Sequence, residues 1–80
     1  MTYDEKWSYP YEQIEEYVLG CGAIKTGSTY ELPECIVVLE TLPPRLIGHL
    51  EFPSTRVIID GPGADEFYKG FFLSFLSGGA

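Results

Sequence analysis

Hydrophobic residues near the end of the chain recur at the spacing of an α-helix. After Gly61-Pro62-Gly63 they occupy positions i, i+3, i+4 and i+7, so the pattern predicts a helix over residues 64–76 with one continuous apolar stripe. Asp65 and Glu66 fall in its first turn, where the helix dipole favours negative charge, and Gly78-Gly79 is expected to end it. The stripe consists of Ala64, Phe67, Tyr68, Phe71, Phe72, Phe75 and Leu76.

A second apolar stripe predicts a helix over residues 9–20. Ser8 is its expected cap, because its side chain can accept hydrogen bonds from free N–H groups of the first turn. Pro10 falls where a missing N–H costs nothing, and Gly20 and Gly22 can supply the positive φ that ends a helix. The expected inward residues are Tyr11, Ile14, Tyr17, Val18 and Cys21.

Between these helices the sequence is typical of β-strands. Gly27-Ser28 predicts a tight turn and Pro53-Ser54 a short turn, while Pro43-Pro44 is expected to stop the pairing. Such short connections favour antiparallel strands, because a parallel crossover needs a dozen residues or more. The third strand is unbroken in its apolarity, which predicts cover on both faces. The strands are expected at residues 23–25, 29–32, 35–42, 46–52 and 56–60.

The chain is therefore predicted to be one small acidic α+β domain over residues 1–80. It would have two layers, with an antiparallel sheet of three to five strands flanked by an N-terminal and a C-terminal helix. At 45% hydrophobic residues it is too apolar to be disordered, and its longest apolar run, residues 35–39, is far shorter than a membrane span. Its first residues lack the pattern of a signal peptide, which favours a cytoplasmic location, in a host cell if a phage encodes it.

The residues suited to metal binding or nucleophilic catalysis are few. Cys21, Cys35 and His49 are fourteen residues apart, without a Cys-x-x-Cys motif or a paired His, so neither a metal nor another cofactor is expected. Catalysis would need a cysteine beside His49 and a third group to orient the ring, and we expect no enzyme. A bridge between the cysteines would close a loop of about 15 residues, but in a reducing cytosol two free thiols are expected, with Cys35 buried.

Acidic residues dominate the charge of the chain. Twelve acids against five bases give a formal net charge of −7, which argues against direct binding to nucleic acid or to an anionic membrane. The acids concentrate among the first twenty residues, where aromatic side chains alternate with them. We expect them to form one negative, partly aromatic face, unless Trp7 and Tyr9 fold back over the core and the acids are merely solvated. The candidate partner-binding residues are Asp4, Glu5, Trp7, Glu12, Glu15 and Glu16.

These features favour a small protein-binding module that docks on the basic surface of another protein. One version is an inhibitor that imitates the phosphate charge of nucleic acid and blocks a nucleic-acid-handling protein, as small phage-encoded inhibitors do. A second hypothesis is a structural homo-oligomer, such as a homodimer, or a complex subunit that uses the aromatic helix or an edge strand. A third is a small-ligand binder at a dimer interface, because 80 residues rarely enclose a pocket of about 300–1,000 Å³ alone.

Overall fold

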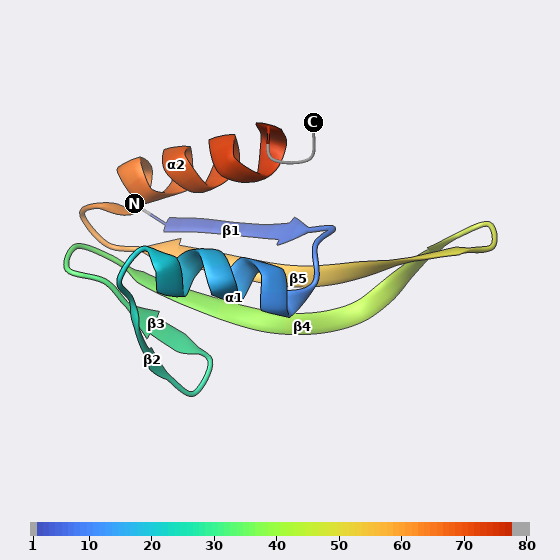
Figure 1. Cartoon of the computed structure of the whole chain (residues 1–80), viewed down its shortest axis with the longest axis horizontal. Helices are drawn as coiled ribbons and strands as arrows, with labels where there is room; N and C mark the ends of the chain where they lie inside the picture. The colour runs from blue at the N-terminus through green and yellow to red at the C-terminus, as the bar shows by residue number, and fades with distance from the viewer. Residues whose placement is uncertain (1, 78–80) are drawn as a thin grey trace.

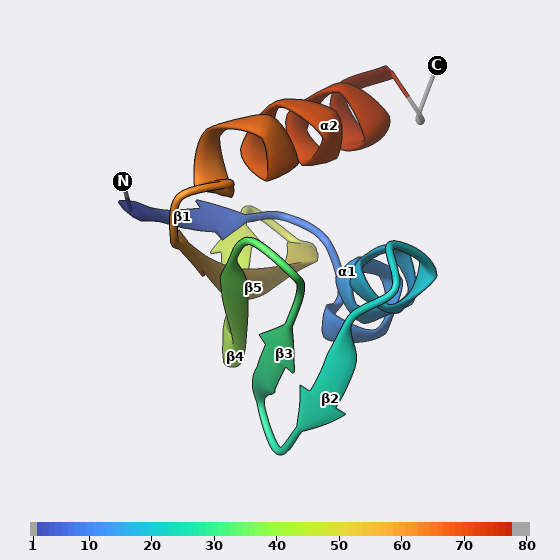
Figure 2. The same cartoon turned by 90° about the vertical axis from the view of Figure 1, so that its left-hand side faces the viewer.

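Two helices lie on one face of a five-stranded antiparallel sheet in the computed structural model of the chain, which describes residues 2–77 and the side chains of residues 2–75 (Figure 1). The strand order across the sheet is β1-β5-β4-β3-β2. A view turned by 90° shows the sheet curling around the helices (Figure 2). In chain order the elements are β1 (Thr2–Trp7), α1 (Tyr11–Gly20), β2 (Ile24–Thr26), β3 (Thr29–Glu31), β4 (Ile36–Ile47), β5 (Leu50–Asp60) and α2 (Ala64–Ser77).

The core fills the space between the helices and the sheet face that they cover. Val37 and Leu39 of β4 lie opposite Ile59 and Val57 of β5, and all four side chains are buried. Helix α1 packs on β4 and β5, whereas α2 packs on β5 and β1. Each such aliphatic side chain contributes about 1.5–3 kcal/mol by leaving water. The buried hydrophobic residues are Ile14, Val18, Tyr30, Cys35, Val37, Leu39, Val57, Ile59, Ala64, Phe71 and Phe75.

The predicted α+β class with an antiparallel sheet is confirmed. The predicted turn at Gly27-Ser28 joins β2 to β3, with Gly27 at a φ of 64°. The C-terminal helix begins at Ala64 as expected, although Phe72 of its stripe is exposed. The side chain of Leu76 and the expected stop at Gly78-Gly79 lie outside the described residues.

The first strand was not predicted, and it displaces α1 from the start of the fold. Strand β1 runs antiparallel to β5, with Tyr3 opposite Ile59 and Trp7 opposite Thr55. Its exposure alternates along the strand, as a half-buried edge strand requires. Glu5 hides this period, because an acidic residue occupies an inward position between Tyr3 and Trp7. The N-terminal helix is therefore the second element of the chain.

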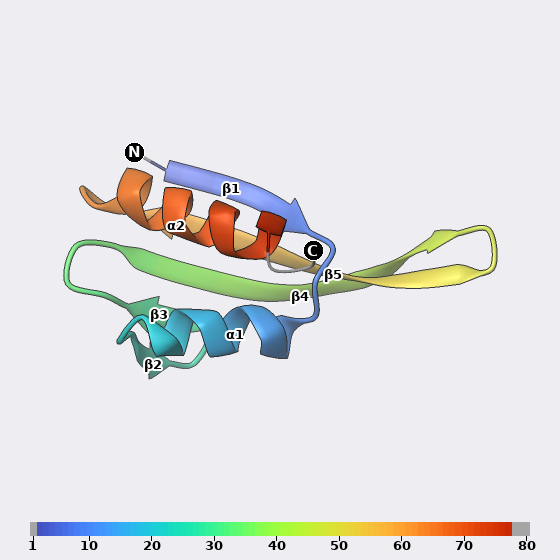
Figure 3. The ribbon, with the colours of Figure 1, turned by 45° about the horizontal axis from the view of Figure 1, so that its top comes forward.

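The strand boundaries around the prolines were predicted wrongly. Pro43-Pro44 lies inside β4, where the sequence predicted a stop in the pairing, and Pro53 lies inside β5, where it predicted a turn. The ladder tolerates these residues because its register shifts between Leu42 and Arg45, and a bulge leaves backbone N–H groups unpaired. The predicted separate strand over residues 46–52 is instead the tip of one long β4–β5 hairpin. This tip projects beyond the helices as an arm (Figure 3).

The prediction that the third strand is covered on both faces is also wrong. Ile36 is 45% exposed, and Val38 is only partly buried, because both described helices lie on the other face of the sheet. We call this uncovered side the outer face. Val38 lies opposite Ile58 there, and Glu40 lies opposite Arg56. The apolar residues of β4 therefore point to both faces of the sheet, but only those on the helix-covered face belong to the core.

Helix α1 differs from its prediction at both ends. It begins at Tyr11, and Pro10 occupies the cap position with no side-chain hydrogen bond, so Ser8 is not the cap. The carbonyl oxygen of Pro10 instead accepts hydrogen bonds from the N–H groups of Gln13 and Ile14, at 3.1 and 3.3 Å. Cys21, expected to face inward, is exposed. No helix among residues 2–77 is long and apolar enough to cross a membrane.

Candidate functional site

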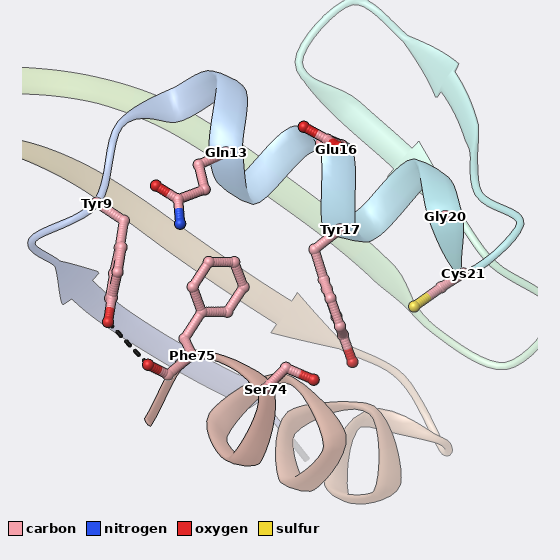
Figure 4. A pocket seen from close by; sticks show the side chains of 8 residues that line it. All are labelled: Tyr9, Gln13, Glu16, Tyr17, Gly20, Cys21, Ser74 and Phe75. Atoms are coloured by element: carbon pink, nitrogen blue, oxygen red, sulfur yellow. Dashed lines mark hydrogen bonds between the residues drawn. The ribbon is translucent and has the colours of Figure 1, made fainter. Parts of the chain in front are cut away.

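A groove of about 610 Å³ lies between α1 and α2. It has a wall from each helix, because the two helices lie beside each other on one face of the sheet (Figure 3). Side chains of the α1 wall and of the α2 wall approach each other across it (Figure 4). The lining residues are Tyr9, Gln13, Glu16, Tyr17, Gly20, Cys21, Ser74 and Phe75.

Aromatic rings form the floor of this groove. The ring of Tyr17 lies 5.6 Å from that of Phe75 and 5.8 Å from that of Phe71, centroid to centroid, both nearly edge-on. The ring of Tyr9 lies 4.9 Å from Phe75, and its hydroxyl donates a hydrogen bond of 2.8 Å to the Phe75 carbonyl oxygen. Gly70 makes room for Tyr17, since a Cβ at Gly70 would meet the tyrosine hydroxyl oxygen at 3.3 Å. The floor is thus held in place from both helices.

The charge of the groove is negative. Glu16 is the one residue with a formal charge among the described lining residues, and it is exposed at the α1 rim. Glu12 lies one helical turn earlier on α1 and is also exposed, and the helix has no base in its last turn. The carbonyl end of α1, at Gly20, adds the negative pole of the helix dipole to the same groove. A cation is therefore the favoured occupant.

Two further polar groups lie in the groove beside its aromatic floor. Burial, and then the nearby Cys21 thiol, raise the pKa of Tyr17, although a hydrogen bond with Ser74 partly opposes the rise. The Tyr17 hydroxyl consequently stays protonated at neutral pH and can serve as a hydrogen-bond donor or acceptor. Cys21 is a free, exposed thiol at the groove, which makes it a natural position for a covalent probe.

The predicted acidic residues do not all share one face. Because side chains alternate along β1, Asp4 lies on the outer face and Glu5 lies on the helix-covered face. Asp4 accepts two hydrogen bonds from the Arg56 guanidinium, at 2.9 and 2.6 Å, and this contact holds the pKa of Asp4 below its usual value. Glu5 accepts a hydrogen bond of 2.8 Å from the Tyr68 hydroxyl. The expectation of one negative face is wrong for these two residues.

Glu15 and Trp7 are engaged inside the protein. The Glu15 carboxylate pairs with Lys25 at 2.6 Å and accepts a hydrogen bond from the Tyr30 hydroxyl; these two contacts, in that order, hold the pKa of Glu15 below its usual value. The Trp7 ring packs edge-on against Phe71, with centroids 4.9 Å apart. Its indole nitrogen is buried with no hydrogen-bond partner in the described structure. The alternative in which Trp7 folds back over the core is therefore confirmed.

Of the six candidate residues, Glu12 and Glu16 are exposed on the same helix, and neither forms an ion pair with another described residue. Sequence reasoning assigned Tyr17 to the core and overlooked the groove that it borders. The one available signal was Gly70, because a glycine inside a helix costs about 1 kcal/mol relative to alanine and needs a packing reason. Gln13 and Ser74 carry no sequence signal, since polar residues on a helix are ordinarily just solvated.

The soft ligands are dispersed over the fold. Cys35 is buried in the core as predicted, where burial raises the pKa of its thiol, while His49 lies exposed in the turn between β4 and β5. Both cysteines are free, as expected. Within the part of the chain that the structure describes, no three His, Cys, Asp or Glu side chains are grouped to hold a metal ion. No known family model matches the chain, and no curated protein matches its sequence.

Proposed function

We propose that this chain is a protein-binding module that holds a basic segment of another protein in the groove between α1 and α2. The observation that carries this proposal is the combination of an aromatic floor with a single charged lining residue, Glu16, which is acidic. A lysine or arginine side chain can pair with that carboxylate while its charge lies near the faces of Tyr9 or Tyr17. Its methylene groups can at the same time cover aromatic surface.

The acidic pair on α1 adds a reason to bind a cation. Glu12 and Glu16 stand at positions i and i+4 of one helix, a like-charge arrangement that costs about 0.2–0.5 kcal/mol. A basic side chain between the two carboxylates would remove this repulsion, so part of the binding free energy would come from relief within the chain. The overall charge of −7 would further speed association with a basic partner.

Inhibition is an extension of this proposal. A protein that handles nucleic acid presents basic residues in the groove that receives phosphates. If such residues enter the groove of this chain, the chain and the nucleic acid compete for them. The strongly acidic composition supports this version, which makes the chain a competitive blocker rather than a passive ligand.

The test is a pull-down from cell lysate with matched charge variants as bait. The wild type is compared with Glu12→Lys/Glu16→Lys and with a control, Glu34→Lys/Glu66→Lys, which changes the net charge equally at two exposed positions outside this groove. Each is run at about 0.05 M and at about 1 M salt, between which the Debye length falls from more than 10 Å to about 3 Å.

We expect a basic protein that the wild type and the control variant retain at low salt, and that the groove variant loses. Its retention should fall at least tenfold at high salt, because several charge pairs are screened together. Equal retention by both double variants would reject the groove as the binding site. Retention unaffected by salt would reject a basic partner.

A further inference from the structure

A hollow of about 360 Å³ lies at the base of the arm, where β1 ends (Figure 3). Three parts of the chain meet there: the end of β1 with the residue after it, the register shift of β4, and β5. Its volume falls in the lower part of the range for small-ligand sites, about 300–1,000 Å³. We call it the basic pocket, because the two residues with a formal charge that line it are Lys6 and Arg45.

The basic pocket has the opposite charge to the chain as a whole. The chain has five bases and a net charge of −7, yet two of the five lie here, and no acidic residue of the described structure lines the pocket. Neither Lys6 nor Arg45 forms an ion pair with another described residue, whereas Lys25 and Arg56 are both paired with acids. An anion is therefore the favoured occupant.

The acids at neighbouring strand positions are engaged elsewhere. Asp4 precedes Lys6 by two residues on β1, but its carboxylate lies 2.6 Å from the Arg56 guanidinium. Glu40 lies opposite Arg56 on β4, with its carboxylate 3.6 Å from the same guanidinium. More distant acids are screened, because the Debye length is about 8 Å at physiological ionic strength. The two bases of the pocket therefore keep positive charge to offer to a ligand.

Hydroxyl groups stand beside these two charges. Ser54 is only 6% exposed, and its hydroxyl forms no hydrogen bond with another described residue. Its oxygen still reaches solvent, since the Trp7 indole nitrogen is the one polar side-chain atom of the described structure that is buried without a partner. A polar group in such a place costs free energy until it gains a hydrogen bond. Ser54 can donate one to an anion in the pocket, and Ser8 adds a second hydroxyl.

An apolar wall completes the basic pocket. Leu42 and Pro43 supply it from β4, and the Trp7 ring supplies it from β1. The Trp7 ring is held by Phe71 and Phe72, whose ring centroids lie 4.9 and 5.9 Å away, both nearly edge-on. Bulges like the register shift of β4 are common beside functional sites, where they redirect a side chain. A ligand that fills this pocket therefore needs an apolar part as well as a negative group.

From these observations we propose that the basic pocket binds a phosphate monoester. Its phosphate lies between Lys6 and Arg45, and its organic part covers the apolar wall. A phosphate monoester carries a charge of about −1.5 to −2 at pH 7 and three acceptor oxygens, which suits two bases and two hydroxyls. The planar guanidinium of Arg45 can hold two of these oxygens at once, while Lys6 acts as a point charge. A monocarboxylate would leave one of the two bases without a partner.

The test is a titration of the full chain with phenyl phosphate, followed by ¹⁵N–¹H NMR. Phenyl sulfate has a similar shape and a single negative charge, so it tests whether the pocket prefers a dianion. Lys6→Gln and Arg45→Gln each remove one charge from the pocket. Lys69→Gln is the matched control, because Lys69 is an exposed base outside the pocket. Amide signals far from the pocket check that each variant folds.

We expect phenyl phosphate to bind with a dissociation constant below about 1 mM at about 0.15 M salt, and to shift the amide signals of Trp7 and Ser54. Lys6→Gln and Arg45→Gln should each raise this constant at least about fivefold, because each removes a hydrogen bond between charged groups. Lys69→Gln should raise it less than about twofold. Phenyl sulfate should bind at least about fivefold more weakly than phenyl phosphate.

A small molecule and a phosphorylated side chain of another protein can both carry this group, so a short peptide with phosphotyrosine forms a second arm of the titration. A dissociation constant at least about tenfold lower for the peptide than for phenyl phosphate would support a phosphorylated protein as the source. A smaller difference would support a small molecule.

Three results would overturn the proposal. The first is the absence of saturable shifts up to about 10 mM for both phenyl phosphate and the peptide. The second is equal affinity for phenyl sulfate and phenyl phosphate, and the third is an equal effect of Lys69→Gln and Lys6→Gln. The proposal does not rest on the groove between α1 and α2, because the two sites share no lining residue.

Discussion

The two halves of the β4–β5 hairpin have the same antiparallel ladder and opposite surroundings. In the half that the helices cover, which we call the body half, Leu39 and Val57 face the helices and are buried. In the arm half, Leu46, Ile47 and Leu50 are all exposed, although they are aliphatic residues in the same two strands. Residue type therefore does not decide burial along this hairpin. The presence of a covering helix decides it, and the body half owes its burial to elements that are distant in sequence.

The largest expected difference between the halves is the cost of shortening a leucine. Leu39→Ala should lower the free energy of unfolding by about 2–5 kcal/mol, because it leaves a cavity in the core. Leu46→Ala should change it by less than about 0.5 kcal/mol, because that side chain is already in water. Urea unfolding of both variants at low protein concentration measures the two costs. Similar costs would mean that the arm is covered in solution.

Glycines at the two ends of β5 sharpen the same comparison. Gly61 follows the strand in the body with a φ of 131°, and a Cβ there would lie 2.8 Å from the Glu34 carbonyl oxygen. Gly48 precedes the strand in the arm with a φ of 62° and has open space around it. Gly61→Ala should therefore destabilise the protein by more than about 2 kcal/mol, and Gly48→Ala by about 1 kcal/mol or less. Thermal unfolding of the two variants ranks their losses of stability. A larger loss for Gly48→Ala than for Gly61→Ala would contradict this prediction.

A smaller effect is expected at alkaline pH, where the partly buried hydroxyl of Tyr68 donates a hydrogen bond to Glu5. Burial, and then the hydrogen bond to Glu5, raise the pKa of Tyr68 to about 12 from its ordinary value of 10. The unfolded chain releases this proton near pH 10 and the folded chain holds it until about pH 12, so stability is full below pH 10 and falls as pH rises between these values.

Tyr68→Phe removes this dependence together with the hydrogen bond. The variant should be less stable than the wild type at pH 8, and the difference should narrow as the pH rises toward 12. Urea unfolding of both proteins at several pH values measures this difference in stability, with absorbance of the tyrosinate as a second readout. A difference that stays constant with pH would show that Tyr68 contributes no alkaline dependence.

The α1 surface illustrates how little of the candidate site the sequence could reveal. Glu12 and Glu16 were identified from composition and helical spacing, and they remain exposed in the structure. Glu15 looks equivalent to Glu16 in the sequence, yet it pairs with Lys25 of β2. That pairing depends on where the β2–β3 hairpin lies beside α1, which local patterns do not encode. The groove likewise depends on the separation between two helices that are more than forty residues apart in the chain.

The sequence by itself determined the two helices, the β2–β3 turn and the antiparallel α+β class, because side-chain period and turn residues act over a few neighbouring positions. Only the tertiary structure decided that Thr2–Trp7 is a strand, since β1 depends on pairing with β5 at the other end of the chain. The same holds for Pro43-Pro44, which the ladder accepts at a register shift. The tertiary structure also decided whether an apolar strand residue lies in the core or at the surface. The two helices cover only one face of this sheet, and they end before the arm begins.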